Sequence, residues 1–137
     1  MSAKSISLDT SFVMRLLVSQ PPDTFRLASR FLAEKLAAHV AVHVSDLVLA
    51  EAYFALQAYY QLPKAAALAT LAKFTRHSGV TVTPVARTVL ALPNLASAKP
   101  GFVDRLIHGE SRAGGHTLVT FEKAAKKLAG TIVVMTE

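Results

Sequence analysis

Apolar and polar residues alternate along this chain with two different periods. Short runs rich in β-branched residues, at positions 5–8, 40–44, 80–83, 117–119 and 131–135, are typical of strands. Longer stretches with helical spacing lie between them, at 12–18, 23–38, 46–60, an alanine-rich segment ending near 77, 102–112 and 121–129. Strands that alternate with helices predict an α/β fold with a mostly parallel sheet.

Polar residues at the predicted helix starts support these boundaries. Asp23, Ser45 and Thr120 each precede or open a helical stretch and carry an oxygen that can accept a hydrogen bond from the first turn. Thr83 followed by Pro84 is typical of an N-cap with proline at the first helical position. The alanines between 65 and 72 predict a helix that packs closely against a neighbour.

The length and composition indicate one folded domain. At 137 residues the chain can bury a sizeable core, and we expect a single domain over 1–137. It is 52% hydrophobic and 18% charged, yet no apolar run reaches the roughly 20 residues needed to span a membrane. The first residues lack the features of a signal peptide, so we expect a cytoplasmic protein without a membrane partner. The absence of cysteine excludes disulfides, thiolate catalysis and cysteine-ligated zinc.

The chain is basic, with a formal net charge of +6 and a pI near 9.9. Such a charge favours a polyanionic partner such as nucleic acid, because lysine and arginine release counterions from phosphates. A basic surface that only confers solubility is the alternative. The chain has no tryptophan and three tyrosines, which argues against an aromatic platform that stacks single-stranded bases.

Four of the nine acidic residues, Asp9, Glu51, Asp104 and Glu122, lie in apolar or turn-like segments. Asp9 closes the first predicted strand and Glu122 follows the fourth, so we expect both at the carboxyl edge of the sheet, where ligands collect. Glu51 has only apolar helical neighbours, so we expect it to point into a polar cavity. A carboxylate removed from water needs a counter-charge, and the four acids therefore indicate a metal site.

Asp9 and Glu51 each have a structural alternative. Asp9 can cap the helix that follows, whereas a metal ligand at this position would leave the capping to Thr10 or Ser11. Glu51 can lie at the rim of its apolar stripe and reach water. Each of these alternatives stays open at the level of the sequence.

The two later acids also have structural alternatives. Asp104 lies early in a helix, where it complements the helix dipole and can pair with His108. Glu122 lies in a predicted first turn capped by Thr120, with Lys126 four residues later. The lysines at 123, 126 and 127 form either a solvated helix face or a contact for phosphates. No zinc-protease motif, phosphate-binding loop or nucleophile elbow is present.

Taken together, the chain resembles PIN domains, and specifically the VapC-type ribonuclease toxins of toxin-antitoxin pairs. The resemblance covers nearly the whole chain. It is carried by LDTS at 8–11, LVLAEA at 47–52, FVDRLI at 102–107 and LVTFE at 118–122. Each motif is short, and their order and spacing on the alternating pattern make the set specific.

The resemblance implies a three-layer α/β/α sandwich around a central, mostly parallel sheet of four to five strands. It also implies that an acid cluster binds Mg²⁺ or Mn²⁺ and hydrolyses RNA phosphodiester bonds. Asp9, Glu51 and Asp104 match the three core acids of the family. Glu122 stands where the family usually has aspartate in a Thr-x-Asp motif, and the extra methylene puts the metal stoichiometry and the rate in question.

The resemblance further implies partners: an RNA substrate, a small antitoxin whose segment enters the acidic groove, and a second copy of the chain in a homodimer. The apolar run 53–60 could supply the dimer interface. The main alternative is a PIN-like module with weakened catalysis that acts through RNA binding or a protein partner. A phosphotransfer domain also places aspartate after the first strand, but this chain lacks the second aspartate that the dehalogenase type requires.

Overall fold

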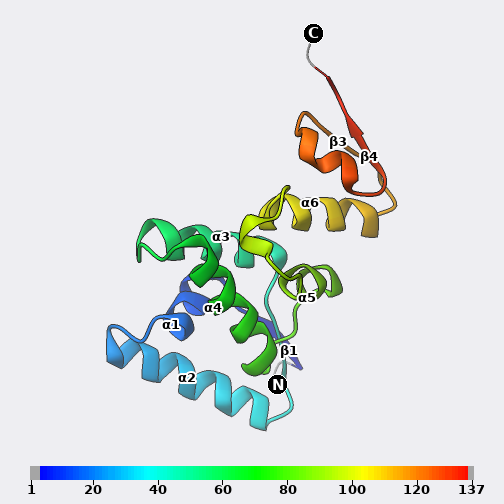
Figure 1. Cartoon of the computed structure of the whole chain (residues 1–137). Helices are drawn as coiled ribbons and strands as arrows, with labels where there is room; N and C mark the ends of the chain where they lie inside the picture. Colours follow the sequence, from blue (N-terminus) through cyan, green and yellow to red (C-terminus); the bar gives the residue numbers. More distant parts are fainter. Residues whose placement is uncertain (1–3, 136–137) are drawn as a thin grey trace. The chain divides into compact units, whose positions relative to one another are not determined.

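The computed structural model describes residues 4–135, which form two compact units, residues up to Thr83 and residues from Pro84 (Figure 1). The first unit contains β1 (Ser5–Ser7), α1 (Thr10–Leu17), α2 (Pro22–Ala37), β2 (Ala41–His43), α3 (Asp46–Ala58) and α4 (Lys64–His77). The second contains α5 (Pro84–Leu90), the 3₁₀ helix η1 (Leu95–Ser97), α6 (Phe102–Ala113), β3 (Leu118–Thr120), the 3₁₀ helix η2 (Lys123–Lys127) and β4 (Thr131–Val133).

The first unit is built on a parallel strand ladder. β1 pairs with β2 in the register Ile6 opposite Val42, and a single parallel bridge from His43 to Thr81 adds the third predicted strand segment. Val42 is buried while its neighbours at 41 and 43 are exposed, as a strand with one buried face requires. Leu8 is buried and continues β1, because its N–H donates a hydrogen bond to the carbonyl oxygen of His43. Asp9, the next residue, therefore leaves the strand pair at its carboxyl edge.

Helices cover this ladder through small and branched side chains. α1 packs against α2 and α3, and α3 packs against α4. The fully buried side chains include Val13 of α1, Leu49 and Leu56 of α3, and Leu71 of α4. Burying one such leucine contributes roughly 1.5–3 kcal/mol, so these contacts stabilise the unit. Ala67 is also buried, which confirms the close helix packing predicted for the alanine-rich segment.

The second unit pairs α5 with α6 and carries its own parallel ladder, with Val119 of β3 opposite Ile132 of β4. Gly109 of α6 allows the two helices to approach, because a Cβ at this position would collide with Cγ1 of Val85. Phe102 and Leu106 provide the buried face of α6. All strand pairs among residues 4–135 are parallel, so the predicted α/β class with parallel strands is confirmed.

Two predicted helix starts are wrong. α2 begins at Pro22 with Pro21 at the N-cap and no side-chain cap, because proline fixes the backbone there and places Asp23 inside the first turn. The stretch 121–129 is not an α-helix. It holds the five-residue 3₁₀ helix η2, with Glu122 itself at the N-cap. Ser45 caps α3 as predicted, through a hydrogen bond from the Val48 N–H.

Candidate active site

Asp9 is fixed at the point where β1 gives way to α1. Its Oδ1 accepts hydrogen bonds from the Phe12 N–H at 2.9 Å and from the Ser11 hydroxyl at 2.8 Å. Asp9 therefore caps α1, which is one of the two alternatives that the sequence left open, and Thr10 and Ser11 do not take over the capping. The cap uses Oδ1, and a carboxylate has a second oxygen that can bind a cation.

The same hydrogen bonds set the charge of Asp9. The Phe12 N–H lowers the pKa of Asp9 below its ordinary value of 3.8, and the Ser11 hydroxyl has the next largest effect in the same direction. Both donors favour the ionised form of the carboxyl group. Partial desolvation acts in the opposite direction and is outweighed. These hydrogen bonds by themselves favour the ionised form of Asp9 at neutral pH.

Glu51 lies on α3 and is tied to the start of α1. The Thr10 hydroxyl donates a hydrogen bond of 2.8 Å to Oε1 of Glu51. Because Thr10 follows Asp9 in the chain, this bond keeps Glu51 beside the residue that caps α1. From the sequence, Thr10 was expected only as an alternative cap. The sequence feature that could have indicated its bond to Glu51 is the position of the Thr10 hydroxyl, next to Asp9 at the end of the first strand.

The surroundings of Glu51 differ from the sequence expectation. Its apolar neighbours Leu47 and Phe54 are 72% and 55% exposed, and Glu51 is exposed with them. The buried face of α3 is formed by other residues, Leu49, Ala52, Tyr53 and Leu56. The exposure of Glu51 fits the alternative that it lies beside its apolar stripe and reaches water, and not the expectation that it points into a polar cavity. The stripe is apolar but exposed.

Asp104 lies in the first turn of α6 and is exposed. The hydrogen bond of His108 goes to the carbonyl oxygen of Ala129 at 2.6 Å. A carbonyl oxygen can only accept, so Nε2 of His108 carries the proton in this bond. The bond commits this ring nitrogen to Ala129, and Asp104 keeps the position that complements the helix dipole.

Glu122 lies at the N-cap of η2. Its Oε1 accepts a hydrogen bond from the Ala124 N–H at 3.3 Å, and its own N–H donates to the Thr120 hydroxyl at 3.0 Å. The predicted first-turn position with Thr120 as the cap is therefore wrong. The reason is local. The Glu122 side chain accepts the hydrogen bond from the Ala124 N–H in the first turn of η2, and the Thr120 hydroxyl accepts from the N–H of Glu122 in the turn before it.

The four acids differ in how far the structure relates them. Asp9 and Glu51 are neighbours in the first unit through Thr10, whereas Asp104 and Glu122 lie on separate elements of the second unit. Considering each unit by itself, the described residues contain no group of three or more histidine or acidic side chains that could hold a metal ion. All four acids are exposed, so burial does not force a cation on any of them, contrary to the sequence expectation.

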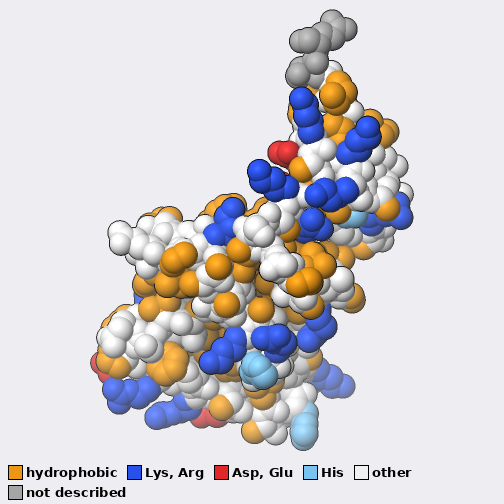
Figure 2. Space-filling view, viewed as in Figure 1, with side chains coloured by type: hydrophobic (Ala, Val, Ile, Leu, Met, Phe, Trp, Pro, Cys, Tyr) orange, Lys and Arg blue, Asp and Glu red, His pale blue; other side chains and the backbone are white. Residues whose placement is uncertain are grey.

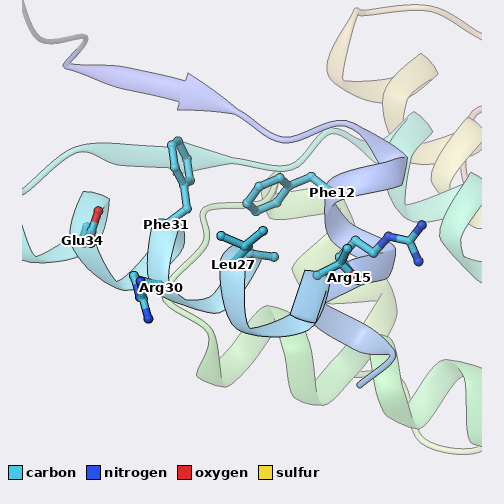
Figure 3. Close-up of a pocket in the computed structure, with 8 residues that line it drawn as sticks. Phe12, Arg15, Leu27, Arg30, Phe31 and Glu34 are labelled. Carbon is cyan, nitrogen blue, oxygen red and sulfur yellow. The ribbon is translucent and has the colours of Figure 1, made fainter. Parts of the chain in front are cut away.

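A second feature of the first unit is a groove of about 430 Å³ between α1 and α2. The Phe12 and Phe31 rings meet edge to face in it, with centroids 5.5 Å apart (Figure 3). Leu27 lines the groove beside these rings, and Arg15 and Arg30 lie at its margin. The acid Glu34 also lines the groove, so its apolar floor is flanked by charges of both signs.

Basic side chains outnumber acidic ones, in keeping with the charge of +6. Figure 2 shows Lys and Arg side chains spread over the visible face, with few Asp or Glu side chains among them. Lys123, Lys126 and Lys127 of η2 are all exposed. None of the helices within residues 4–135 combines the length and the hydropathy that crossing a membrane requires.

Comparison with known proteins agrees with this arrangement. The family model of the PIN domain matches residues 6–131, a span that includes all four acids and runs through both units. No curated protein and no solved structure gives a significant match. Residues 4–135 contain parallel strands and six α-helices, and because the family model matches most of its length, the chain belongs to the PIN domain family.

Proposed function

We propose that this protein is a metal-dependent endoribonuclease, the toxin of a type II toxin-antitoxin pair. PIN domains are generally nucleases, often acting on RNA. The observation that carries the proposal is the Thr10–Glu51 hydrogen bond, because it ties Glu51 to the residue that follows Asp9, and both acids match core positions of the family. We further propose that residues 1–137 act as one nuclease domain, because the family match spans both units.

The proposed metal ligands are Asp9, Glu51, Asp104 and Glu122, and the proposed ion is Mg²⁺ or Mn²⁺. Carboxylate oxygens are the ligands that such hard cations prefer. Asp9 and Glu51 fit this role, since both are exposed carboxylates held by short hydrogen bonds from neighbouring hydroxyls. When bound, a divalent cation makes water easier to deprotonate and neutralises charge on the phosphate.

The protein's own groups contribute positioning. The Phe12 N–H and the Ser11 hydroxyl orient Asp9 and keep it ionised. Thr10 limits the rotamers of Glu51, so less entropy is lost when the carboxylate binds its ligand. The exposed lysines of η2 are suited to phosphate oxygens of the RNA backbone.

A second candidate function is an RNA-binding or protein-interaction module with weakened catalysis. Glu122 favours it, because its Oε1 is engaged in capping η2 and its side chain is one methylene longer than the usual aspartate. In this case the protein binds RNA through its basic surface without cutting it.

The proposed partners follow from the family resemblance. A small antitoxin is the expected protein partner, and the groove between α1 and α2 offers it an apolar surface with Arg15 and Arg30 at the margin. A homodimer is proposed through the run 53–60. Tyr53 in this run is buried, but Phe54, Tyr59 and Tyr60 are exposed and available to a second copy. We also propose that the protein acts in the cytoplasm.

The test is cleavage of labelled RNA by the full chain. We expect cleavage with Mg²⁺ or Mn²⁺, none in excess EDTA, and recovery when the cation is restored. Asp9→Asn and Glu51→Gln should each abolish cleavage. Asp23→Asn and Glu34→Gln are matched controls, because they neutralise exposed acids of the same unit outside the proposed site. Cleavage that persists in EDTA refutes the proposed metal dependence, and cleavage that persists in Asp9→Asn refutes the proposed role of Asp9. Retained RNA binding without cleavage by wild type supports the second candidate.

A further inference from the structure

The chain passes from the first unit to the second between Thr83 and Pro84, two residues that we call the junction. Pro84 is already the first residue of α5, so the boundary falls directly at the start of a helix. Proline fixes its own φ at about −65°, and its ring confines the preceding residue to extended conformations. The backbone of the junction therefore has less rotational freedom than an ordinary connection of two residues.

The side chain of Thr83 is also held. Its hydroxyl donates a hydrogen bond of 2.6 Å to Oδ1 of Asp46, a residue 37 positions earlier in the chain. Asp46 is the first residue of α3, is half-buried and belongs, like Thr83, to the first unit. The bond is at the short end of the usual range, as is typical when a carboxylate accepts from a hydroxyl.

A backbone hydrogen bond brings these two residues together. The Val44 N–H donates to the carbonyl oxygen of Thr81 at 3.0 Å, in the parallel segment that adds Thr81 to the strand ladder. Asp46 follows Val44 by two residues, and Thr83 follows Thr81 by two. The two side chains therefore leave the ladder at the same carboxyl end, where the hydrogen bond joins them.

Asp46 also has an ordinary structural role. An acid in the first turn of a helix complements the helix dipole and stabilises the helix with or without a partner. That role accounts for an acid at position 46, but it does not account for the Thr83 hydroxyl that reaches Asp46 from a separate segment. The hydrogen bond to the junction is thus a second property of Asp46.

We propose that Asp46 is a positioning residue: it anchors Thr83 and so fixes the point and the direction in which the chain leaves the first unit. Through this anchor it limits the arrangements that the second unit takes relative to the first. The importance of this for catalysis rests on the proposed function, because the four proposed metal ligands are divided between the two units. Ligands on two units can serve one ion only when the arrangement of the units is reproducible.

The first test measures distances between the units in the full chain and requires no RNA. The sequence contains no cysteine, so spin labels attach only to cysteines that are introduced. Lys73→Cys on α4 with Glu110→Cys on α6 places one label on each unit at an exposed position. Arg26→Cys on α2 with Lys73→Cys lies within the first unit and is the control pair. Double electron–electron resonance gives the distance distribution for each pair.

Two substitutions of Asp46 separate the hydrogen bond from the helix-dipole effect. Asp46→Ala removes the acceptor and the charge, and it should broaden the distribution between the units while leaving the control pair unchanged. Asp46→Asn removes the charge but keeps an oxygen that accepts from Thr83, so it should retain the wild-type distribution. Thr83→Val removes the donor and should broaden the distribution as well. Adding Asp46→Ala to Thr83→Val should broaden it little further, because both remove the same bond.

Cleavage of RNA is the second readout. Asp46→Ala should lower kcat roughly tenfold, because a misplacement of about 1 Å in a catalytic site can cost about a hundredfold. KM should change little, since the basic side chains that suit phosphates are untouched. Asp46→Asn should restore kcat together with the narrow distance distribution.

The outcomes distinguish this proposal from the nuclease proposal. Equal distributions between the units for Asp46→Ala and wild type overturn the positioning role, even when cleavage is intact. Equal broadening in Asp46→Asn and Asp46→Ala assigns the effect to the charge and also overturns it. A change in the control pair overturns it too, because the first unit itself is then altered. Broadening in Asp46→Ala with rescue by Asp46→Asn supports the anchor, even when wild type cuts no RNA.

Discussion

The hydroxyl of Thr10 donates a 2.8 Å hydrogen bond to the carboxylate of Glu51, which joins two residues 41 positions apart. Asp9 is the N-cap of α1, and Thr10 is the first residue of this helix. The start of α1 therefore connects two of the proposed metal ligands, Asp9 directly and Glu51 through Thr10. The bond joins two side chains of the protein, and it limits the positions that the Glu51 carboxylate can take relative to the start of α1.

Thr10→Val should lower cleavage while leaving the fold intact. Valine keeps the size of threonine but cannot hold Glu51, and a misplacement of the carboxylate by about 1 Å can reduce a rate roughly a hundredfold. The loss of one hydrogen bond should cost about 1 kcal/mol of stability. Steady-state cleavage and thermal melts measure the two effects. Thr10→Ser, which keeps the hydroxyl, should retain most activity, and equal rates for the valine and serine variants would contradict the positioning role.

Acid should destabilise the protein partly through Asp9. Hydrogen bonds lower the pKa of Asp9 in the folded state, so its stabilising contribution is present above the ordinary value of 3.8 and is lost as pH falls through the folded pKa below it. Thermal melts of wild type and Asp9→Asn between pH 2 and pH 7 should converge toward the acid end, because asparagine keeps a capping oxygen without titrating. A constant difference across this range would show that Asp9 does not contribute in this way.

Glu122→Asp should increase cleavage. Aspartate restores the length that the family usually has at this position, and it is also a good N-cap, so η2 should keep its stability. Cleavage rates at saturating Mg²⁺ measure the effect, with Glu110→Asp on the exposed surface of α6 as the control. A slower enzyme would indicate that the site is built around glutamate.

Gly109→Ala should destabilise the second unit. The added Cβ collides with Val85 Cγ1, and overpacking of this kind costs roughly 1–3 kcal/mol. Alanine regains about 1 kcal/mol of helix propensity, so the net loss is expected at the lower end of that range. Chemical denaturation measures it. The double variant with Val85→Ala removes the colliding methyl groups and should recover part of the loss, whereas additive effects would exclude this collision as the cause.

Much of the local structure follows from the sequence because its causes are local. The buried positions Val40, Val42 and Val44 alternate with exposed ones, and this period of two predicted β2. Ser45 predicted the start of α3 because its hydroxyl reaches an N–H three residues on. The segment after β3 was predicted less well. The composition of residues 121–129 predicted an α-helix, but Glu122 caps the short 3₁₀ helix η2 there.

By itself, the sequence determined the order of strands and helices, the cap of α3 and the four acids that match the family's positions, since periodicity, capping and motif spacing act within a few residues. Only the tertiary structure decided that Thr10 holds Glu51 and that the apolar residues beside Glu51 on α3 are exposed. These features depend on which elements pack against each other, and such packing joins side chains that are far apart in the chain.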